Sequence, residues 1–519
     1  MAEKTGQADV LIAGAGPTGL VLALWLTKLG VQVRIIDKAA EPGTTSRALA
    51  IQARTLEFYQ QIGLAQAVID RGHQVAALNL WVKSARAARV PIGNLGQGLT
   101  AFAFPTIFPQ DEHERLLIAR LSELGVEVER PVELTAFEDD GTEIRATFSK
   151  AGSEETGTYA YLAGCDGARS KVREVLNTGF PGGTYDHLFY VADVEAAGPP
   201  MNGELHIALD EADFLAVFPL QDTGRARLIG SIRDDAAKDH EHLHFDDVRA
   251  RAMQNLKIEV KRVNWFSTYR VHHRVADFFR KGRVFLLGDA AHVHSPLGGQ
   301  GMNTGIGDAV NLAWKLAASL KEPFSAALLD SYEPERIAFA QRLVATTDRA
   351  FTAVTSPGAW ARFIRTKAIP ALAPALFRVP VARRLLFRTV SQIAVNYRAS
   401  FLSSGAAGNV HGGDRLPWVG VGTSGANESN FAALTSLDWQ IHIYGDAADD
   451  IRALSDRRKI PLHVFAWRPA MEGSGLRRGA VYLVRPDGYV AMAGLKSSAA
   501  AIDSYLDQRK IGAISQIFA

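Results

Sequence analysis

The stretch ADVLIAGAGPTGLVLALWLTKLGVQVRIID, residues 8–37, decides the fold of the first part of this 519-residue chain. It begins with a short apolar run, passes through a glycine-rich turn, continues as an apolar segment of helical length that ends at Gly30, and closes on a second apolar run. A glycine commonly follows the last turn of a helix, and the two apolar runs have the length of buried strands. The order strand, glycine turn, helix, strand predicts a βαβ unit and therefore an α/β fold with a parallel sheet.

The turn GAGPTG places glycines at positions 14, 16 and 19. In a βαβ unit, Gly14 permits the tight turn, Gly16 lets a pyrophosphate touch the backbone, and Gly19 allows the helix to pack closely on the strand. The first N–H groups of the helix are donors for phosphate oxygens. Asp37 ends the second strand, where a carboxylate accepts hydrogen bonds from ribose hydroxyls. The motif predicts a dinucleotide site, and the alternative is a packing turn with an Asp at the surface.

Two later stretches have a similar form. In YLAGCDGARSKVREVL, residues 161–176, a strand delivers Asp166 and Gly167 to a turn before a helix, although an ordinary turn with an N-cap Asp would look the same. In GRVFLLGDAAHVHSP, residues 282–296, Asp289 ends a buried strand, where a ligand hydroxyl could satisfy its carboxylate. Both stretches indicate further parts of one site.

Residues 298–303, GGQGMN, open the helix that follows. Glycines let the backbone approach a ligand, and the start of a helix favours negative charge, so an anionic group is expected against this main chain. Just before it, His292 and His294 alternate along the sequence. Alternating histidines can form a metal pair, but no cysteine or acidic cluster lies near them in the sequence, and we predict no metal site.

The composition excludes several classes of protein. The formal net charge of +2 gives no reason to expect nucleic acid as a partner. The only cysteine, Cys165, excludes an internal disulfide and suits the cytoplasm. The sequence has no run of 18 apolar residues, so no membrane span is expected. Residues 368–395 are apolar with scattered arginines and fit either a membrane-surface helix or, as prolines 370, 374 and 380 favour, helices packed on their own protein.

In this order and at these distances, the three motifs resemble the FAD-binding fold of the single-component aromatic hydroxylases, the flavoprotein monooxygenases that include p-hydroxybenzoate hydroxylase. Four stretches resemble the phenol hydroxylase branch, which also includes polyketide and 3-hydroxyphenylpropionate hydroxylases. They are SRALAIQARTLEFYQQIGL (46–64), HSPLGGQGMNTGIGDAVNLAWKL (294–316), YRASFL (397–402) and RPDGYVAMAG (485–494).

The resemblance implies the fold class α/β, with a Rossmann-like FAD-binding domain of the p-hydroxybenzoate hydroxylase type, an inserted β-rich substrate domain and a C-terminal thioredoxin-like domain. We expect residues 1–74, 104–180 and 276–330 in the FAD-binding domain and 75–103 and 181–275 in the substrate domain. A helical segment is expected at 331–405 and the thioredoxin-like domain at 406–519. Because C-x-x-C is absent, that domain cannot exchange dithiols.

The resemblance also implies which residues hold the cofactor. Gly14, Gly16, Gly19, Asp37 and Lys38 would hold the ADP half of FAD. Arg47 would lie against the pyrophosphate side of FAD, Gln110 would contact its adenosine or ribityl part, and Asp289 would bind its ribityl chain. Asp166 would contact FAD as well. The backbone of Gly299, Gly301, Met302 and Asn303 would surround the pyrimidine edge of the flavin. Asp166 would also serve the nicotinamide donor.

The substrate residues follow in the same way. Tyr269 matches a tyrosine that contacts the substrate hydroxyl in phenol hydroxylases, and Pro296 would lie over the flavin ring; with Arg47 they are the expected catalytic residues. Phe214 and Phe218, four apart on one strand face, could line the pocket or be plain core residues, and His206 could point into the same cavity. Where phenol hydroxylases carry an active-site Asp, this chain has Leu49.

The function implied is that of an FAD-dependent monooxygenase that hydroxylates a phenolic or other aromatic substrate with O2, through a flavin C4a-hydroperoxide. No second glycine fingerprint follows a strand, so NADPH or NADH would bind only transiently as electron donor. Two alternatives stay open: Baeyer–Villiger or epoxidation chemistry on a polyketide-like substrate, and a non-catalytic protein that binds FAD and an aromatic ligand. A homodimer is also compatible with the resemblance.

Overall fold

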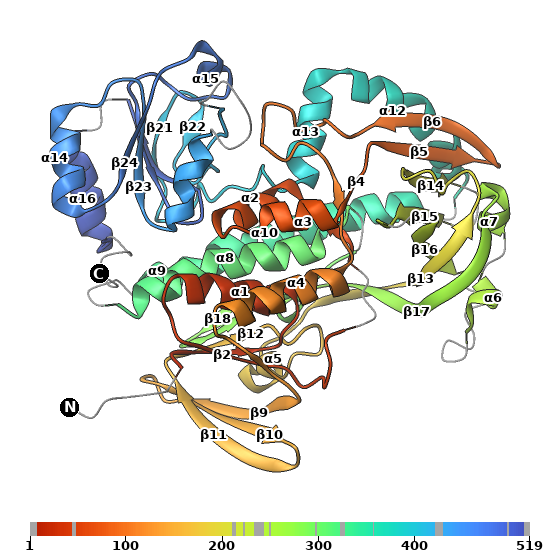
Figure 1. Ribbon diagram of the computed structural model, residues 1–519, viewed down its shortest axis with the longest axis horizontal. Helices are drawn as coiled ribbons and strands as arrows, with labels where there is room; N and C mark the ends of the chain where they lie inside the picture. The colour runs from red at the N-terminus through yellow and green to blue at the C-terminus, as the bar shows by residue number, and fades with distance from the viewer. Residues whose placement is uncertain are drawn as a thin grey trace.

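The chain folds around a sheet whose strands come from distant parts of the sequence (Figure 1). The computed structural model describes residues 8–43, 48–209, 214–221, 224–232, 243–248, 251–295, 298–321, 327–355, 358–420, 429–495 and 498–512. Arg47 and Pro296 lie outside the described residues, so their predicted roles have no structural account here.

The first sheet has the order β18-β19-β12-β1-β2-β8. Its strands are β1 (Val10–Ala13), β2 (Val33–Ile36), β8 (Val128–Glu129), β12 (Tyr161–Gly164), β18 (Arg280–Lys281) and β19 (Val284–Leu286). The central strands run parallel and are completely buried, as their continuous apolar sequence predicts. The predicted strand, glycine turn, helix, strand order of residues 8–37 is therefore confirmed.

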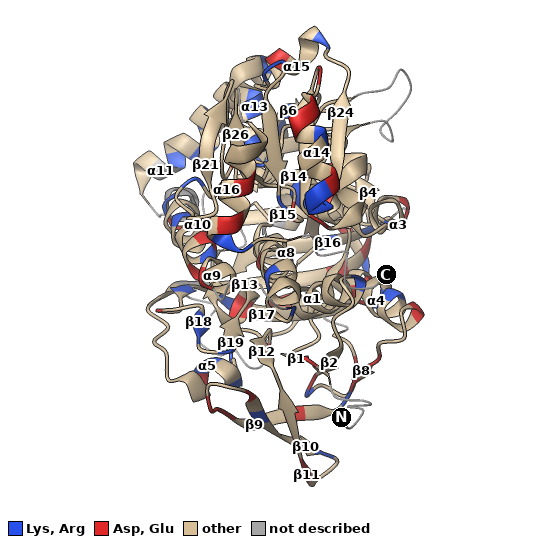
Figure 2. Ribbon diagram, turned by 90° about the vertical axis from the view of Figure 1, so that its left-hand side faces the viewer, with Lys and Arg blue, Asp and Glu red and all other residues tan. Residues whose placement is uncertain are grey.

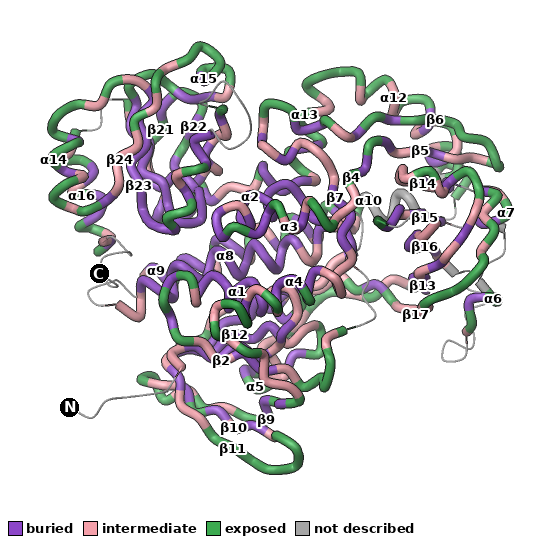
Figure 3. Tube along the Cα trace, in the orientation of Figure 1, coloured by how far each residue is buried: buried purple, intermediate pink, exposed green. Residues whose placement is uncertain are grey.

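Helices cover this sheet on one side. They are α1 (Pro17–Lys28), α4 (Gln110–Glu123) and α8 (Gly301–Ser319). Residues 19–26 of α1 and 303–318 of α8 are buried without interruption, and both helices run through the middle of the molecule (Figure 3). A separate sheet of β9 (Val132–Asp139), β10 (Ile144–Lys150) and β11 (Ser153–Tyr159) and the short helix α5 (Lys171–Leu176) lie on the other side of the first sheet (Figure 1).

A long sheet with the order β20-β17-β13-β16-β15-β14-β5-β6 forms the second body. Its strands are β5 (Ala77–Val82), β6 (Ala85–Pro91), β13 (Gly182–Ala197), β14 (Leu205–Leu209), β15 (Phe214–Pro219), β16 (Arg225–Ile232), β17 (Glu259–Val275) and β20 (His292–Val293). Its far face carries α6 (Phe245–Val248) and α7 (Arg251–Leu256), and its near face packs on the main core. The pairing of β5 with β14 joins two segments more than 100 residues apart.

Shorter elements fill the space between these bodies. The strands β3 (Ala50–Ile51), β7 (Thr106–Ile107) and β4 (His73–Gln74) form a small sheet beside α2 (Ala53–Gln61) and α3 (Ala65–Arg71). The helical segment consists of α9 (Ala327–Asp330), α10 (Tyr332–Thr355), α11 (Ala359–Phe363), a π-helical turn at Ile364–Ala368, α12 (Ile369–Arg378) and α13 (Pro380–Val390).

The C-terminal sheet has the order β22-β21-β26-β25-β23-β24. Its elements are β21 (Ser404–Ala407), β22 (Val410–His411), β23 (Gln440–Tyr444), α14 (Asp449–Arg458), β24 (Leu462–Phe465), α15 (Pro469–Gly473), β25 (Val481–Val484), β26 (Val490–Gly494) and α16 (Ala499–Arg509). Strands β23 and β24 are parallel, whereas β25 is antiparallel to both β23 and β26. Helix α16 follows the last of these strands.

A buried network of charges joins this C-terminal part to the centre of the molecule. Arg485 donates to both carboxylate oxygens of Glu335 on α10, at 2.8 and 3.0 Å, and to Asp487. Lys315 of α8 lies 2.9 Å from the same Glu335 carboxylate, and Trp314 donates to Asp487 at 3.1 Å. The RPDGY stretch therefore holds α8 and α10 against the C-terminal sheet.

Candidate active site

The glycine turn after β1 is tight on one side and open on the other. Gly14 has φ +104°, and a Cβ on it would lie 2.3 Å from the Cys165 carbonyl oxygen at the end of β12. A Cβ on Gly19 would lie 2.0 Å from the Gly14 carbonyl oxygen. A Cβ on Gly16 would meet no protein atom within 4 Å. The turn thus needs Gly14 and Gly19 for packing, and it leaves space at Gly16, where the sequence predicts the pyrophosphate.

Asp37 lies at the end of β2, beside this turn. One carboxylate oxygen accepts the Ala15 N–H and the other accepts the Ala39 N–H, each at 2.8 Å. Arg130, a residue that sequence reasoning missed, places a guanidinium nitrogen 3.3 Å from the same carboxylate and donates to the Ala15 carbonyl. A carboxylate has about four lone-pair sites, so acceptor capacity remains for ribose hydroxyls. Lys38, next along the chain, is exposed.

Gln110 begins helix α4 and lies against the segment that follows residue 47. Its backbone N–H donates to the Ala48 carbonyl at 3.2 Å, and its side-chain amide donates to Glu114 at 2.7 Å. Burial raises the pKa of Glu114. The position suits the predicted contact with the cofactor, but the amide already has a protein partner.

The two carboxylate oxygens of Asp166 have different surroundings. Its Oδ2 accepts the backbone N–H groups of Lys171 at 2.7 Å and Val172 at 3.1 Å, as an Asp at a helix start does. Its Oδ1 is buried and has no hydrogen-bond partner among the described residues. Burial raises the pKa of this carboxyl. A buried acceptor without a partner is costly, so Oδ1 fits a ligand hydroxyl.

The third motif meets the first one at Thr18. Gly288, at φ +57°, would bring a Cβ within 2.7 Å of the Thr18 hydroxyl oxygen, and a Cβ on Gly305 of α8 would come within 2.3 Å of it. In the turn after β19, Gly288 and Ala290 are buried, but Asp289 between these two residues is exposed. The Asp289 side chain therefore lies on the outer side of the turn. Close packing on Thr18 therefore brings the glycine turn, Asp289 and helix α8 together.

His292 and His294 have different surroundings. The Nε2 of His292 lies 2.7 Å from Asp308, whose other oxygen accepts from Arg336 at 2.6 Å, so His292 belongs to a buried structural network. Burial lowers the pKa of His294 to about 4. Its Nδ1 bonds to the Ser295 carbonyl at 2.7 Å, and its buried Nε2 has no partner in the described part of the chain. Within the same described ranges, no group of three His, Cys, Asp or Glu side chains is placed to hold a metal.

The loop before α8 depends on glycine and on Asn303. Gly298 and Gly299 have φ of +78° and +60°, and a Cβ on Gly299 would lie 2.8 Å from the Ala50 side chain. The Asn303 side chain accepts from the Gln52 N–H and the Thr55 hydroxyl and donates to the carbonyls of Ala50 and Gly299. The Asn303 side-chain amide is thus fully used in holding the loop, so Asn303 has only its backbone left for the cofactor. Gly301 and Met302, in the first turn of α8, are half-buried.

One face of the long sheet carries three of the predicted substrate residues, Tyr269, Phe214 and Phe218. Tyr269 pairs in register with Phe189, and their rings lie 6.0 Å apart. Phe214 and Phe218 point to this same face, as their spacing of four predicts, and both are half-buried. Phe218 and Tyr269 pack on the core of the first sheet, so this face is turned towards the FAD motifs.

His206 lies on the opposite face of that sheet. It pairs with Val217, which packs with the residues of α6 and α7. Trp81 donates to its Nδ1 at 2.9 Å, its Nε2 lies 2.8 Å from Asn202 Oδ1, and burial lowers its pKa to about 4. The structure does not bring His206 into one cavity with Tyr269, because the strand alternation puts them on different sides.

No carboxylate takes the place of the missing Asp among the described residues that line this face. Leu49 is buried, and its carbonyl accepts the Phe108 N–H at 2.7 Å. Asp193, an acid on this face, is held by Arg227 through two hydrogen bonds of 2.6 and 2.8 Å. Arg227 also donates to the Ala48 carbonyl at 3.4 Å, so this pair, which sequence reasoning missed, connects the sheet to the segment next to Leu49.

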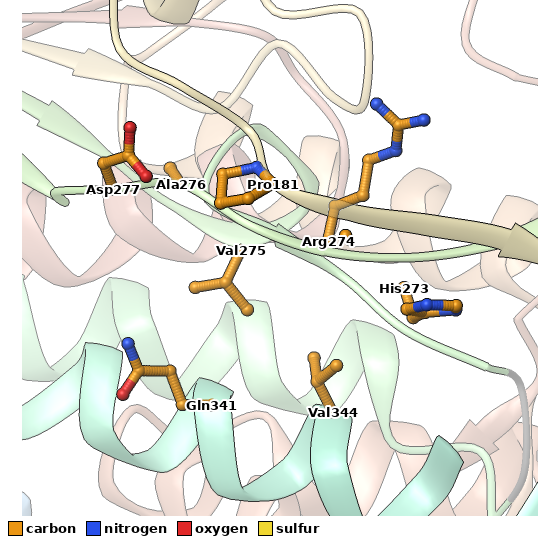
Figure 4. A pocket seen from close by; sticks show the side chains of 9 residues that line it. Pro181, His273, Arg274, Val275, Ala276, Asp277, Gln341 and Val344 are labelled. Atoms are coloured by element: carbon orange, nitrogen blue, oxygen red, sulfur yellow. The ribbon is translucent and has the colours of Figure 1, made fainter.

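A pocket of about 240 Å³ lies where β13 begins and β17 ends, facing α10. It is lined by residues 181–182 and 273–277 together with Gln341 and Val344 (Figure 4). None of the predicted site residues lines it. No described helix is long and apolar enough to cross a bilayer.

Comparisons with known proteins agree with this geometry. The sequence profile of the family described as "FAD binding domain" matches residues 7–347. The 6-methylpretetramide 4-monooxygenase of Streptomyces rimosus is 34% identical over 98% of this chain and 94% of its own length. A dialkyldecalin synthase of Streptomyces rugosporus is 35% identical over 66% of this chain and 72% of its own length. The solved structure of OxyS anhydrotetracycline hydroxylase from Streptomyces rimosus superposes with a TM-score of 0.77 at 27% identity, covering 97% of this chain and 99% of OxyS.

The glycine turn, the open space at Gly16, the unpartnered oxygen of Asp166 and the loop before α8 all fit a bound FAD. With the match over residues 7–347 and the full-length similarity to a monooxygenase, they show that the chain belongs to the family of FAD-dependent aromatic monooxygenases.

Proposed function

We propose that this monooxygenase hydroxylates a phenolic, polyketide-like aromatic substrate held between the FAD motifs and the near face of the long sheet. The observation that carries the proposal is the row of aromatic side chains on that face, in which Tyr269, Phe189, Phe214 and Phe218 lie on the same side of the sheet and Phe218 and Tyr269 pack on the main core. Aromatic rings offer a flat, apolar surface for a fused-ring substrate and exclude water.

The cofactor residues take the following roles in this proposal. Gly16 faces the pyrophosphate, Asp37 holds the adenosine ribose, Asp166 offers its Oδ1 to a cofactor hydroxyl, and Asp289 binds the ribityl chain. Gly14, Gly19, Lys38, Arg47, Gln110, Gly299, Gly301, Met302 and Asn303 complete the proposed FAD site. Bound FAD, reduced by NADPH or NADH, supplies the activation of O2 that allows one oxygen atom to pass to the substrate.

The chain's own groups tune that chemistry. The first N–H groups of α8, at Gly301 and Met302, carry the positive end of the helix dipole and favour negative charge on the neighbouring ring. The neutral His294 has a buried lone pair on Nε2 near this helix start, which can accept a hydrogen bond from the cofactor or the substrate. With Leu49 at the position of the family's Asp and Asp193 paired to Arg227, the Tyr269 hydroxyl is the proposed contact for the substrate hydroxyl, and Pro296 is proposed to lie over the ring.

The proposal also covers the division of the chain into domains. We propose the FAD-binding domain, substrate domain and helical segment at the boundaries given above, and a thioredoxin-like fold for residues 406–519. The parallel pair β23 and β24, the antiparallel pair β25 and β26, and the closing helix α16 support that fold. The buried Cys165 is the only cysteine, so this part acts structurally. A homodimer and a cytoplasmic location stay predictions.

A second function is favoured by one observation, the 35% identity to a dialkyldecalin synthase. In that case the same aromatic face would bind a substrate that gains no oxygen. The test is the product mass after incubation with NADPH, NADH and O2. Hydroxylation and epoxidation both add one oxygen atom, as does Baeyer–Villiger insertion, and fragmentation of the product separates them. A product of unchanged mass would favour the second function.

A further inference from the structure

The helices between Gly358 and Val390 form an exposed surface that the proposed reaction does not use. We call residues 358–390, which contain α11, the π-helical turn, α12 and α13, the helical arm. Eight of the thirteen large apolar side chains that are exposed among the described residues lie in it. The most exposed are Val381 (76%), Trp360 (73%) and Leu385 (67%).

The inner side of the arm is anchored to the protein. Ile369 and Ala373 of α12 pack on a cluster that contains Leu80 and Leu209 of the long sheet. Phe387 of α13 is buried against Gly96, where an added Cβ would lie 2.3 Å from its ring. The arm is therefore a fixed part of the fold, and its outer side is presented to the surroundings.

The outer side of α13 carries both apolar and basic groups. Val381, Leu385 and Arg388 follow the spacing i, i+4, i+7, on the side of the helix opposite the buried Phe387. Arg384 beside them is exposed as well. On α11, the rings of Trp360 and the half-exposed Phe363 stack with centroids 5.6 Å apart.

Positive charge is concentrated in this part of the chain. Between Asp348 and Asp414 the sequence has nine Lys or Arg residues and no Asp or Glu. The formal total is +2, so the remaining residues carry −7. In Figure 2, α11 and α13 carry basic and no acidic positions.

We propose that the helical arm docks the protein onto the surface of an anionic phospholipid bilayer. Helices that combine exposed Trp, Phe and Leu with Lys and Arg insert their apolar side chains at the headgroup boundary, while the cations meet lipid phosphates. None of the described helices is long and apolar enough to cross the bilayer, so the contact is peripheral.

Other occupants fit this surface less well. A symmetric dimer would bring the same patch of both copies together and oppose basic groups to basic groups. A nucleic acid would satisfy the cations but would leave the aliphatic side chains Leu372, Leu376, Val381 and Leu385 without an apolar partner. A lipid surface satisfies both kinds of group.

The placement of the arm links docking to the substrate face. Leu209, which packs with α12, pairs in register with Phe214 at the edge of the proposed substrate face. Docking would therefore place one end of that face beside the lipid boundary, where an apolar aromatic compound can be taken up.

The test uses the full-length, FAD-loaded protein in a vesicle flotation assay. One set of vesicles is phosphatidylcholine alone, and the other contains about a third phosphatidylglycerol. The protein should float with the anionic vesicles at low salt and dissociate from them at roughly 0.5 M NaCl. Binding to neither kind of vesicle would overturn the proposal.

Matched variants locate the surface. The double variant R384E/R388E should bind anionic vesicles at least about tenfold more weakly. R145E/R477E changes the net charge equally at two exposed arginines outside the arm and should bind as the parent does. Trp360→Ala, which leaves the charge unchanged, should weaken binding severalfold. Unchanged FAD content and NADPH oxidation would show that all variants are folded.

Three results would contradict the assignment. Equal losses in R384E/R388E and R145E/R477E would mean that only net charge matters. Sedimentation of the parent as a dimer that Leu385→Glu separates would mean that the arm contacts a second copy. Tighter binding to a 20-nucleotide single-stranded RNA probe than to the anionic vesicles would mean that the arm serves nucleic acid.

Discussion

Arg485 of the C-terminal sheet is bound through both of its terminal nitrogens to the carboxylate of Glu335 on α10, at 2.8 and 3.0 Å, and both side chains are buried. The neighbouring charges hold the pKa of Glu335 well below its usual range despite burial, with Arg485 the largest favourable influence. The pair lies within hydrogen-bond reach of Lys315 on α8, the helix whose first turn is proposed to face the flavin. The C-terminal part is therefore fastened to the helix that bears the active-site loop.

Removal of one partner from this pair should destabilise the protein strongly. Glu335→Gln would leave Lys315 buried without its counter-charge and Arg485 with Asp487 alone, which costs about 3–5 kcal/mol of unfolding free energy. Urea unfolding followed by circular dichroism measures the loss. Glu143→Gln removes a surface partner of Arg145, 3.8 Å away, and should cost less than about 1 kcal/mol. Equal losses in the two variants would contradict the role given to the buried pair.

Substitution of the glycines in the first turn should separate folding from cofactor binding. Gly16 has φ −78° and open space at its Cβ position, so Gly16→Ala should fold normally and bind FAD at least about tenfold more weakly because the methyl group meets the pyrophosphate. Gly14→Ala and Gly19→Ala should reduce soluble yield instead. The control is Gly473→Ala, which also meets no neighbour within 4 Å. Normal FAD affinity in folded Gly16→Ala would remove the pyrophosphate from this turn.

Asp166→Asn should weaken FAD binding more than it affects stability. An amide offers one oxygen, which can serve either the N–H groups of α5 or a cofactor hydroxyl, but not both in the present geometry. About a tenfold loss of FAD affinity is expected, measured by flavin fluorescence. Ser170→Ala removes the N-cap acceptor of Arg173 on the same helix and should cost about 1 kcal/mol of stability with unchanged FAD affinity. The reverse pattern would make Asp166 a helix cap only.

Tyr269→Phe should lower hydroxylation or its coupling to NAD(P)H oxidation about three- to tenfold, because the proposed bond to the substrate hydroxyl is lost. Tyr190→Phe makes the same chemical change on the opposite face of the same strand pair, where Tyr190 pairs with Thr268 and packs against Phe266. It should leave turnover unchanged. Unchanged product formation by Tyr269→Phe would exclude the contact.

The protein should lose stability as the pH falls below about 6. Burial lowers the pKa of His113 and His442 to about 3 and that of His206 and His294 to about 4, whereas each is about 6.5 in an unfolded chain. Between pH values of about 4 and 6.5 these four histidines bind about four more protons in the unfolded chain, so the free energy of unfolding falls with falling pH, by at most about 5.5 kcal/mol per unit. Urea midpoints at several pH values test this. His442→Phe should flatten the slope by about a quarter, and an unchanged slope would show that His442 does not contribute.

The parts of the fold that follow from local rules could be predicted from the sequence. The unit β1, α1, β2 follows from the length of the apolar runs and from the glycine turn. Contacts between distant segments could not be predicted in this way. The local sequences around Arg227 and Asp193 contain no pattern that predicts the pairing of these residues across β16 and β13. In the same way, only the tertiary arrangement brings Arg485 to Glu335.

In the candidate site, too, local patterns predict some features, whereas contacts between distant segments could not be predicted. Strand alternation correctly puts Phe214 and Phe218 on one face, but it cannot tell which face of β14 meets the cofactor, and His206 lies on the other side. Asn303 stands in a stretch that resembles the family, yet its amide is fully used in fastening the loop. Its four partners come from three separate elements, which no local pattern reveals.

The most direct test of the proposed hydroxylase is oxidation of NADPH and NADH by the FAD-loaded protein across a panel of simple phenols and fused-ring aromatic polyketides, with product masses and hydrogen peroxide measured together. We predict that a fused-ring phenol accelerates NAD(P)H oxidation and yields a product heavier by one oxygen atom with little peroxide. NAD(P)H oxidation that no aromatic compound accelerates, or acceleration that yields only hydrogen peroxide across the whole panel, would contradict the proposed hydroxylation.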